Sequence, residues 1–310
     1  MKIVSIVILI YNEESTIVEL WNRLYKTIQT IPYKFEIIFV NDASIDESRK
    51  ILEDLIYLHP NIIRIIDFSR NFGHPQALTA GMNHSSGDCI ILMDGDLQDS
   101  PESISKFIDK WENGYDVVYA IREKRKEFFI KRILFKLFYK IQALIVNIDI
   151  PVDAGIFSLM DRKVVNIILE MKENNKYIPG LRAYTGFKQV GLEIEREKRY
   201  YGKTRVGNTR LIKLALDGIF TFSNVPLKFA TYIGIILAFP SLVLSIIVVL
   251  IKIFSDNATP GWASNLATTF FIGGIQLIFL GIIGEYLSRI YEEVKRRPYY
   301  IISKKTGFEK

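Results

Sequence analysis

The stretch that decides the fold is Cys89-Ile90-Ile91-Leu92-Met93-Asp94-Gly95-Asp96-Leu97-Gln98. An apolar run of this kind is typical of a buried parallel strand. Its end places two carboxylates at the carboxyl edge of a sheet, where open α/β sheets bind ligands. Proteins commonly bind Mg²⁺ or Mn²⁺ through one or two carboxylates plus substrate phosphates, so the pattern favours a metal site. The alternative is that Asp94 caps a turn and Asp96 is solvated.

Four further apolar segments, at residues 3–10, 35–40, 62–68 and 116–121, repeat this pattern. Each is followed by polar residues: Tyr11-Asn12-Glu13-Glu14, Asn41-Asp42-Ala43-Ser44, Ser69-Arg70-Asn71-Phe72-Gly73 and Arg122. Helical stretches separate the strands, so the chain is predicted to form an α/β, mostly parallel, doubly wound sheet. The polar residues are expected to meet at one edge of it.

Composition narrows the function classes. The chain has 310 residues, a net charge of +6 and 49% hydrophobic residues. Its single cysteine, Cys89, lies inside a predicted strand and cannot form an internal disulfide. The three histidines form no metal-spaced pair and no serine-centred elbow is present, which disfavours a hydrolase triad. The first turn lacks G-x-G-x-x-G, which counts against a dinucleotide-binding Rossmann domain.

The C-terminal third contains two apolar runs, Phe229 to Phe254 and Leu266 to Tyr286. Each is long enough to cross a hydrocarbon core of about 30 Å as a helix. The alternative is a pair of buried helices. The connecting loop has no Lys or Arg, whereas basic residues follow the second run. The positive-inside rule therefore predicts a multi-pass protein of the inner (plasma) membrane, with the sheet domain and the C-terminus in the cytoplasm.

The motifs at the strand ends resemble, in order and spacing, those of family 2 glycosyltransferases with the GT-A fold. The resemblance continues through Val152-Asp153-Ala154-Gly155, Leu159-Met160-Asp161-Arg162 and Gly186-Phe187. The chain looks most like the polyprenyl-phosphate group, which includes bactoprenol glucosyltransferases and dolichol-phosphate mannose synthases. The resemblance implies inverting transfer of a sugar, with UDP-glucose favoured as nucleotide-sugar donor, to polyprenyl (undecaprenyl) phosphate. The product would serve cell-envelope glycan modification.

The resemblance also implies a role for individual residues. Tyr11, Asn12, Glu13, Asp42 and Asp94 are expected on the donor. Asp94 and Asp96 would face the diphosphate and a Mg²⁺ or Mn²⁺ ion, with Asp96 as the first choice of ligand and Gln98 completing the shell. Asp153 is expected to orient the acceptor or the sugar. The residues expected to hold phosphates are Arg122, Arg199 and Arg205. The alternatives are an Asx turn at Asp42, a turn at Asp153 and ordinary surface charges at the arginines.

A division of the chain follows from these features. We expect a cytoplasmic GT-A catalytic domain at 1–208, an interfacial amphipathic helix at 209–228, two transmembrane helices at 229–288 and a basic tail at 289–310. The helix at 209–228 has an ordinary surface helix as its alternative. Basic residues beside aromatic ones can indicate nucleic acid, but beside two predicted spans a membrane and a lipid phosphate are favoured. No nucleic acid is expected as a partner, and a homo-oligomer is possible.

The chain departs from the family pattern at one informative place. Family members commonly carry Gly-Asp-Phe-Arg where this chain has Gly155-Ile156-Phe157-Ser158. No general base is therefore expected at Ile156, and glucose is less well supported as the sugar. A phosphate monoester acceptor needs little deprotonation, because its second pKa is about 6. The open alternatives are another donor such as GDP-mannose or a modified UDP-sugar, a polysaccharide-extending transferase, and a non-catalytic membrane scaffold.

Overall fold

The chain divides into two compact units in the computed structural model. The first comprises Met1–Gly207 and Pro298–Lys310, and the second comprises Asn208–Arg297. The residues that the structure describes are 2–122, 154–171, 173, 176–194, 227, 230, 232–234, 236, 243 and 261–308. Each unit is considered by itself below.

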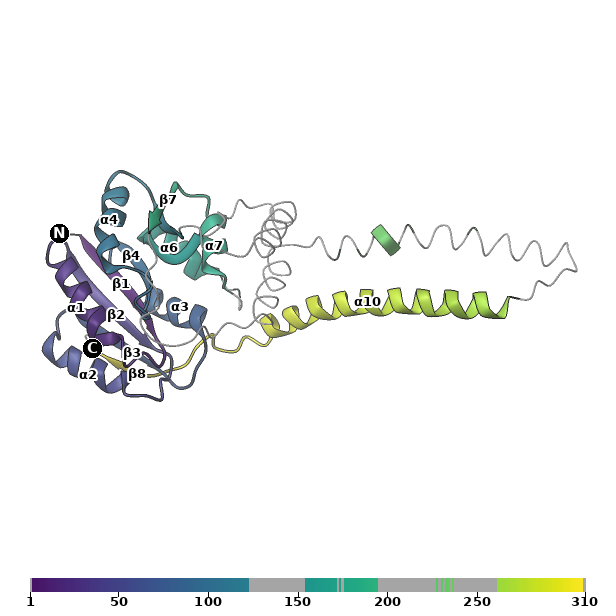
Figure 1. Ribbon diagram of the computed structural model, residues 1–310, viewed down its shortest axis with the longest axis horizontal. Helices are drawn as coiled ribbons and strands as arrows, with labels where there is room; N and C mark the ends of the chain where they lie inside the picture. The colour runs from purple at the N-terminus through teal and green to yellow at the C-terminus, as the bar shows by residue number, and fades with distance from the viewer. Residues whose placement is uncertain are drawn as a thin grey trace, which may run out of the picture. The chain divides into compact units, whose positions relative to one another are not determined.

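The first unit is built on an eight-stranded sheet with the order β7-β5-β6-β4-β1-β2-β3-β8 (Figure 1). The strands are β1 (Ile3–Ile10), β2 (Lys34–Asn41), β3 (Ile63–Phe68), β4 (Cys89–Asp94), β5 (Val117–Arg122), β6 (Ala154–Asp161), β7 (Gln189–Ile194) and β8 (Ile302–Thr306). Neighbouring pairs among β4, β1, β2 and β3 are parallel, whereas β6 runs antiparallel to β4 and β5. The carboxyl ends of β1 to β5 therefore share one edge.

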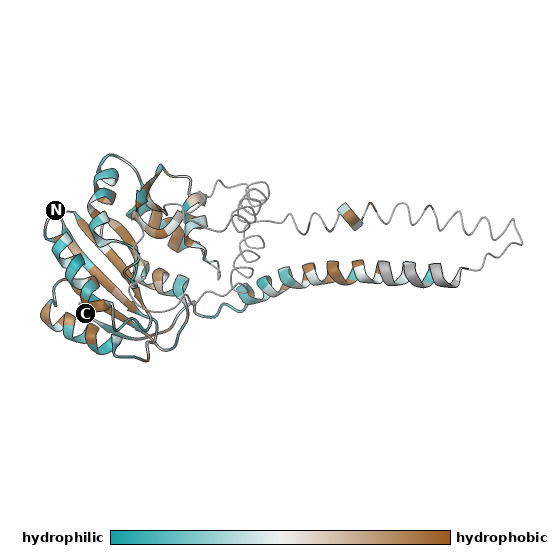
Figure 2. Cartoon of the chain, viewed as in Figure 1, coloured by the Kyte–Doolittle hydropathy of each residue, from teal (hydrophilic) through white to brown (hydrophobic). Residues whose placement is uncertain are grey.

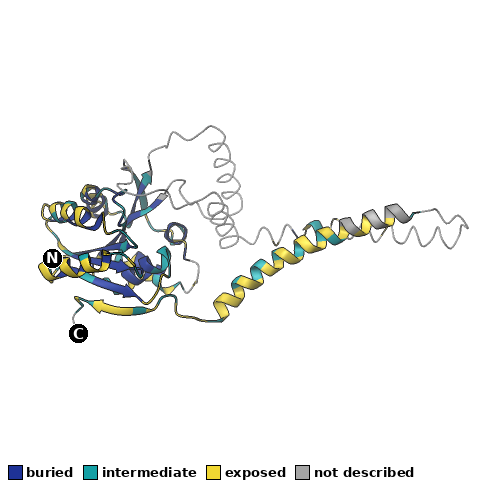
Figure 3. Cartoon of the chain, turned by 60° about the horizontal axis from the view of Figure 1, so that its bottom comes forward, coloured by how far each residue is buried: buried dark blue, intermediate teal, exposed yellow. Residues whose placement is uncertain are grey.

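Helices cover the sheet and bury its apolar strands. They are α1 (Ile17–Ile28), α2 (Ser48–Leu58), α3 (His74–His84), the 3-10 helix η1 (Pro101–Ser103), α4 (Ile104–Glu112), α6 (Arg162–Glu170) and α7 (Ile178–Tyr184). Helix α1 shows the pattern: Ile17, Leu20, Trp21 and Leu24 are buried at helical spacing. Figure 2 shows the central strands as hydrophobic, and Figure 3 shows them as buried. This buried sheet positions the loops at its edge.

The predicted α/β, mostly parallel sheet is confirmed. Predicted strands at 3–10, 35–40, 62–68 and 116–121 correspond to β1, β2, β3 and β5. The sequence pattern did not predict β8, which pairs antiparallel with β3 at the edge of the sheet. Residues 302–306 had been assigned to a basic tail, and their side chains are largely exposed.

In the second unit, the described helix is α10 (Trp262–Val294), which contains the second predicted span. Among the described residues, no helix offers a segment with the length and apolar character needed to cross a membrane. Helix α10 continues past its apolar part into Glu285, Arg289 and Glu292, and most of the first predicted span lies outside the described residues. The prediction of two transmembrane helices, and with it that of a multi-pass inner-membrane location, is therefore wrong for the described part of the chain.

Candidate functional site

The backbone takes an unusual conformation after three neighbouring strands. Asn12, Ala43 and Leu97 follow β1, β2 and β4, and their φ angles are 53°, 55° and 57°. Side chains other than glycine rarely adopt this left-handed region, and such residues cluster at functional sites. The three loops at the carboxyl edge are therefore held in conformations that the surrounding contacts impose.

Gly95 allows the two carboxylates of the Asp94-Gly95-Asp96 turn to follow β4 directly. Asp94 pairs in register with Leu9 of β1. A Cβ atom at Gly95 would lie 2.7 Å from the Leu9 carbonyl oxygen and 2.6 Å from Cδ1 of Ile10. The Gly95 carbonyl accepts a 2.9 Å hydrogen bond from the buried Thr16 hydroxyl. Only glycine fits this close approach of two backbones, so the turn is fixed against β1.

The loops after β1 and β2 are joined by hydrogen bonds. The Asn12 backbone N–H donates to the Ser44 hydroxyl at 3.0 Å, and the Asn12 side-chain oxygen accepts from the Ile45 backbone N–H at 2.9 Å. The Glu13 N–H donates to the Ser48 hydroxyl at 2.9 Å. These contacts show that Asn12 shapes the loop pair itself, whatever it also contributes to a ligand.

Asp42 is buried and receives two backbone hydrogen bonds from the loop after β3. Its carboxylate oxygens accept from the Phe72 N–H at 2.7 Å and from the Gly73 N–H at 2.9 Å. Gly73 has a φ of 107°, which suits glycine. Burial raises the pKa of Asp42, because it outweighs the opposing effect of the two N–H groups. The hydrogen bond expected for an Asx turn at Asp42 is made by Asn41, whose side-chain oxygen accepts from the Ser44 N–H.

His74, the first residue of α3, contacts the first carboxylate of the Asp94-Gly95-Asp96 turn. Its Nε2 lies 2.7 Å from Oδ1 of Asp94. Burial lowers the pKa of His74, but the charges of Asp94, Asp42 and Asp96 outweigh burial, and the net shift is upward. The sequence pattern did not select His74, because it lies 20 positions before Asp94 and forms no metal-spaced pair.

The C-terminal segment contacts the start of the loop after β3 and the helix α3 that begins with His74. The Ser69 N–H donates to the Ile301 carbonyl at 3.0 Å. The Tyr300 ring stacks on Phe68 with centroids 5.3 Å apart, and its hydroxyl accepts from the Asn83 amide of α3 at 3.1 Å. The segment that leads into β8 therefore contacts the start of the loop and the C-terminal end of α3.

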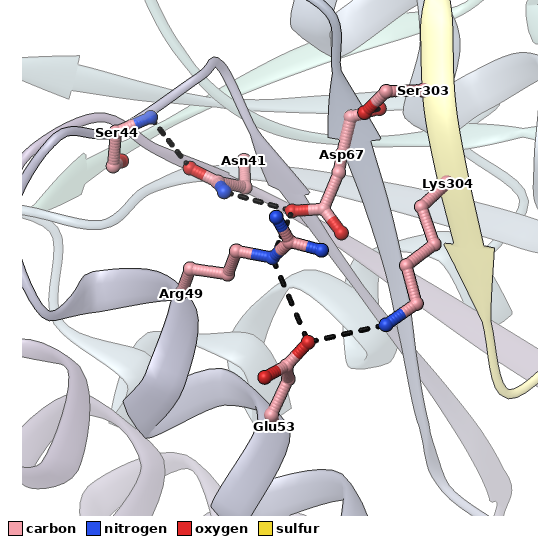
Figure 4. A network of polar contacts seen from close by, with 7 residues as sticks. All are labelled: Asn41, Ser44, Arg49, Glu53, Asp67, Ser303 and Lys304. Atoms are coloured by element: carbon pink, nitrogen blue, oxygen red, sulfur yellow. Dashed lines mark hydrogen bonds and ion pairs between the residues drawn. The ribbon is translucent and has the colours of Figure 1, made fainter.

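A polar network connects β8 with the end of β2 (Figure 4). The Asn41 amide donates to Asp67 at 2.8 Å, and the Ser303 hydroxyl donates to the Asp67 carbonyl at 3.0 Å. Arg49 faces Asp67 and Glu53 at 3.8 and 3.6 Å, and Lys304 reaches Glu53 at 3.2 Å. The residue next to Asp42 is thus held in place by side chains from β3, α2 and β8.

The structure brings most of the predicted donor residues to one edge of the sheet. Tyr11, Asn12 and Glu13 follow β1, Asp42 follows β2, and Asp94, Asp96 and Gln98 end or follow β4. Asp96 accepts a 3.2 Å hydrogen bond from the Gln98 N–H. Arg122 ends β5 at the same edge, although its side chain is not described. Asp153, Arg199 and Arg205 lie outside the described residues.

The carboxylates of Asp94 and Asp96 suit a cation that is bound together with a substrate. Within the described residues, no three His, Cys, Asp or Glu side chains are grouped so as to hold a metal ion. Two carboxylates at a sheet edge match the common Mg²⁺ arrangement, in which one or two carboxylates act together with substrate phosphates. Asp94 and Asp96 therefore fit a metal whose shell is completed by a ligand.

A buried positive charge lies beside strands β5 and β6, on helix α7. Arg182 of α7 is 1% exposed. Its Nη1 donates to the Gly155 carbonyl at 3.3 Å and its Cζ lies 4.7 Å from the Tyr119 ring centre, whereas Nε and Nη2 have no hydrogen-bond partner in the part of the chain that the structure describes. Burial lowers the pKa of Arg182 to about 10. The sequence pattern did not select this residue either.

Comparisons with known proteins identify the family. The model of glycosyl transferase family 2 matches residues 5–169, and that of the GtrB C-terminal hairpin matches residues 225–290. An uncharacterized glycosyltransferase of Bacillus subtilis (strain 168) is 44% identical, over 98% of this chain and 94% of its own length. A prophage bactoprenol glucosyl transferase homolog of Escherichia coli (strain K12) is 38% identical, over 97% and 98%.

A bactoprenol glucosyl transferase of Shigella phage SfII is 37% identical, over 97% of each chain. The protein is thus a glycosyltransferase, the class that the resemblance at the strand ends predicted. The chain belongs to glycosyl transferase family 2.

Proposed function

We propose that this glycosyltransferase moves a sugar from a nucleotide-sugar, with UDP-glucose favoured, to polyprenyl phosphate with inversion at the anomeric carbon. The observation that carries the proposal is the similarity to bactoprenol glucosyl transferases along nearly the whole chain. The acidic edge formed by Asp42, Asp94 and Asp96 supports the donor half of the proposal.

On the donor side, Asp42 would receive the base or ribose. Its two oxygens are fixed by the Phe72 and Gly73 N–H groups, and each carboxylate oxygen can accept a further hydrogen bond. A ligand hydroxyl or base N–H that donates to it would meet a buried, oriented acceptor. Tyr11, Asn12 and Glu13, on the adjacent loop, would line the same part of the donor.

On the diphosphate side, Asp96 and Asp94, with Gln98, would hold the cation. When bound, Mg²⁺ or Mn²⁺ would supply Lewis-acid neutralisation of the departing diphosphate. The choice between the two metals stays open. Carboxylates at a sheet edge fit a cation whose remaining ligands are phosphate oxygens of the nucleotide-sugar.

In the reaction, a phosphate oxygen of the acceptor forms the new bond to the anomeric carbon. The bond from that carbon to the donor diphosphate breaks, and its electron pair leaves with the nucleoside diphosphate. A largely dianionic phosphate needs no strong base, because its second pKa is about 6. Arg122, Arg199 and Arg205 are proposed to hold phosphates, and Asp153 is proposed to orient the acceptor or the sugar.

The identity of the sugar is a separate question because of Ile156. The pairing of β6 with β4 ends at Ser158 and Leu92, and its pairing with β5 is irregular between Ser158 and Ala154. Ile156 lies in this irregular part of β6, where family members commonly place an acid. This observation favours testing GDP-mannose and modified UDP-sugars next to UDP-glucose.

The test is product analysis with the purified full chain. The chain is incubated with polyprenyl phosphate and each nucleotide-sugar in turn, with Mg²⁺ or Mn²⁺, and the lipid product is weighed by mass spectrometry. The expected product is polyprenyl phosphate carrying one sugar, formed by the parent and not by Asp96→Ala. Absence of a glycosylated lipid with every donor would refute the proposed acceptor.

A further inference from the structure

The loop between β3 and α3 contacts the ends of two strands that are not neighbours. Strand β3 pairs with β2, whereas β4 lies on the far side of β1. The loop's backbone N–H groups at Phe72 and Gly73 bind Asp42 after β2, and its next side chain, His74, reaches Asp94 at the end of β4. One loop therefore fixes two acids on strands separated by β1.

The place of His74 is itself well determined. It begins an 11-residue helix, is followed by Pro75 at the first turn, and is preceded by Gly73 in a left-handed conformation. Its side chain is one third exposed and that of Asp94 is 21% exposed, so both lie at the surface of the edge. The 2.7 Å contact therefore joins two partly exposed side chains.

We propose that His74 is a positioning residue for the donor site, and that Nε2 of its ring fixes the orientation of the Asp94 carboxylate before the nucleotide diphosphate and its cation bind. This inference rests on the proposed function. Residues behind a metal ligand orient it, and their loss typically weakens metal affinity about 10- to 100-fold. His74 would act through Asp94, without itself contacting the reacting atoms.

Two substitutions of His74 distinguish a role of its ring nitrogen from a role of its ring size. His74→Phe keeps a ring of similar size but removes the hydrogen-bonding nitrogen. His74→Gln removes the ring but can place an amide nitrogen near the position of Nε2. The matched control is His84→Phe, because His84 ends the same helix and its Nδ1 contacts only the Ala80 carbonyl among the hydrogen bonds observed.

The experiment measures Mn²⁺ binding by electron paramagnetic resonance in the presence of UDP, with the full chain and no acceptor. We expect His74→Phe to weaken Mn²⁺ binding about tenfold, His74→Gln to recover most of the loss, and His84→Phe to match the parent. Steady-state transfer with varied Mn²⁺ should show the same order in the metal concentration needed, and the melting temperatures of the His74 variants should stay close to the parent's.

Parental Mn²⁺ affinity in His74→Phe would overturn the positioning role, as would a His74→Gln variant no better than His74→Phe, or a parent that does not bind Mn²⁺ with UDP. These outcomes differ from failure of the proposed function. If the parent binds Mn²⁺ with UDP but forms no glycosylated lipid, the acceptor assignment fails while the role of His74 is still decided by the binding data.

Discussion

Two regions of the first unit treat buried polar groups in opposite ways. At the edge formed by β1, β2 and β4, Asp42 is bound by Phe72 and Gly73, and Asn12 is bound to the neighbouring loop. Beside β5 and β6, the guanidinium of Arg182 is buried, and within the described residues its Nε and Nη2 have no hydrogen-bond partner. The first region is preorganised by its own contacts, whereas the second holds a buried charge that the described residues satisfy only in part.

The two regions differ in what their polar groups do for the protein: one favours ligand binding, and the other lowers the stability of the fold. A preorganised acidic edge loses little entropy when a ligand binds, which suits the recognition of a nucleotide diphosphate. A buried cation without a counter-charge lowers the stability of the folded state. The two regions should therefore respond oppositely to substitution: loss of activity at the first, and a gain of stability at the second.

The largest expected effect is at the edge. Asp96→Ala should lower sugar transfer by roughly 100-fold or more, because cation assistance supplies several kcal/mol of charge stabilisation. The stability should change little. Rates are measured under saturating Mg²⁺ or Mn²⁺, and the control is Asp54→Ala, which removes an exposed carboxylate of α2. Parental turnover in Asp96→Ala would remove this residue from the site.

A second change tests whether the edge is rigid. Gly95→Ala places a Cβ atom 2.7 Å from the Leu9 carbonyl oxygen, and overpacking of this kind costs roughly 1–3 kcal/mol. We expect lower stability together with weaker donor binding, measured by denaturant unfolding and UDP titration. Gly273→Ala is the control, since within the described residues, its own helix backbone aside, no atom lies within 4 Å of its Cβ position. An unchanged Gly95→Ala variant would contradict the close packing of this turn.

Arg182→Met tests the second region, because it removes the buried charge. Burial lowers the pKa of Arg182 to about 10, so its charge is disfavoured in the folded state. The resulting penalty is fully present below pH 10 and disappears only as the pH rises to the unfolded value. Removal of the charge at pH 7 should raise the free energy of unfolding by roughly 1–3 kcal/mol.

The matched control for Arg182→Met is Arg162→Met. Arg162 donates to the Gly87 carbonyl at 2.7 Å and to the Ser85 hydroxyl at 3.1 Å, so its removal should destabilise the fold. Both variants are measured by urea unfolding at pH 7. Equal destabilisation by the two would show that Arg182 is as well compensated as Arg162, and the contrast between the regions would be lost.

The smallest expected effect concerns the C-terminal support of the edge. Tyr300→Ala removes the ring stacked on Phe68 and should cost roughly 1–2 kcal/mol, with a rise of a few-fold in the KM for the donor. Tyr300→Phe keeps the ring and loses only the contact with Asn83, so it should lie close to the parent. A Tyr300→Phe variant as impaired as Tyr300→Ala would assign the effect to the hydroxyl.

Much of the edge followed from local sequence, because apolar runs bounded by polar residues mark parallel strands and their ends. The runs before Tyr11, Asn41 and Asp94 predicted three parallel strands and placed the polar residues that follow them at one edge of the sheet. Long-range contacts were not predictable in this way. His74 meets Asp94 only because a loop crosses back over β1, and β8 is a short strand with Lys304 and Lys305, which reads as a solvated tail but is typical of a protected edge strand.

The other differences have equally specific causes. Two membrane spans were predicted from hydropathy and from the charges beside the apolar runs, whereas no helix among the described residues has the length and apolar character needed to cross a membrane. The burial of Arg182 depends on how α7 packs against β6, which no local pattern encodes. Asp42 was expected to be either a ligand residue or a turn residue, yet its two hydrogen bonds come from a loop 30 positions later in the chain.

The most direct measurement is calorimetric titration of UDP into the full chain with and without Mn²⁺, for the parent and for Asp96→Ala. If the acidic edge is the donor site, the parent binds UDP more tightly by at least about tenfold when Mn²⁺ is present, and Asp96→Ala loses this gain. UDP binding that is independent of Mn²⁺ in the parent, or equally Mn²⁺-dependent in Asp96→Ala, would contradict the assignment of this edge.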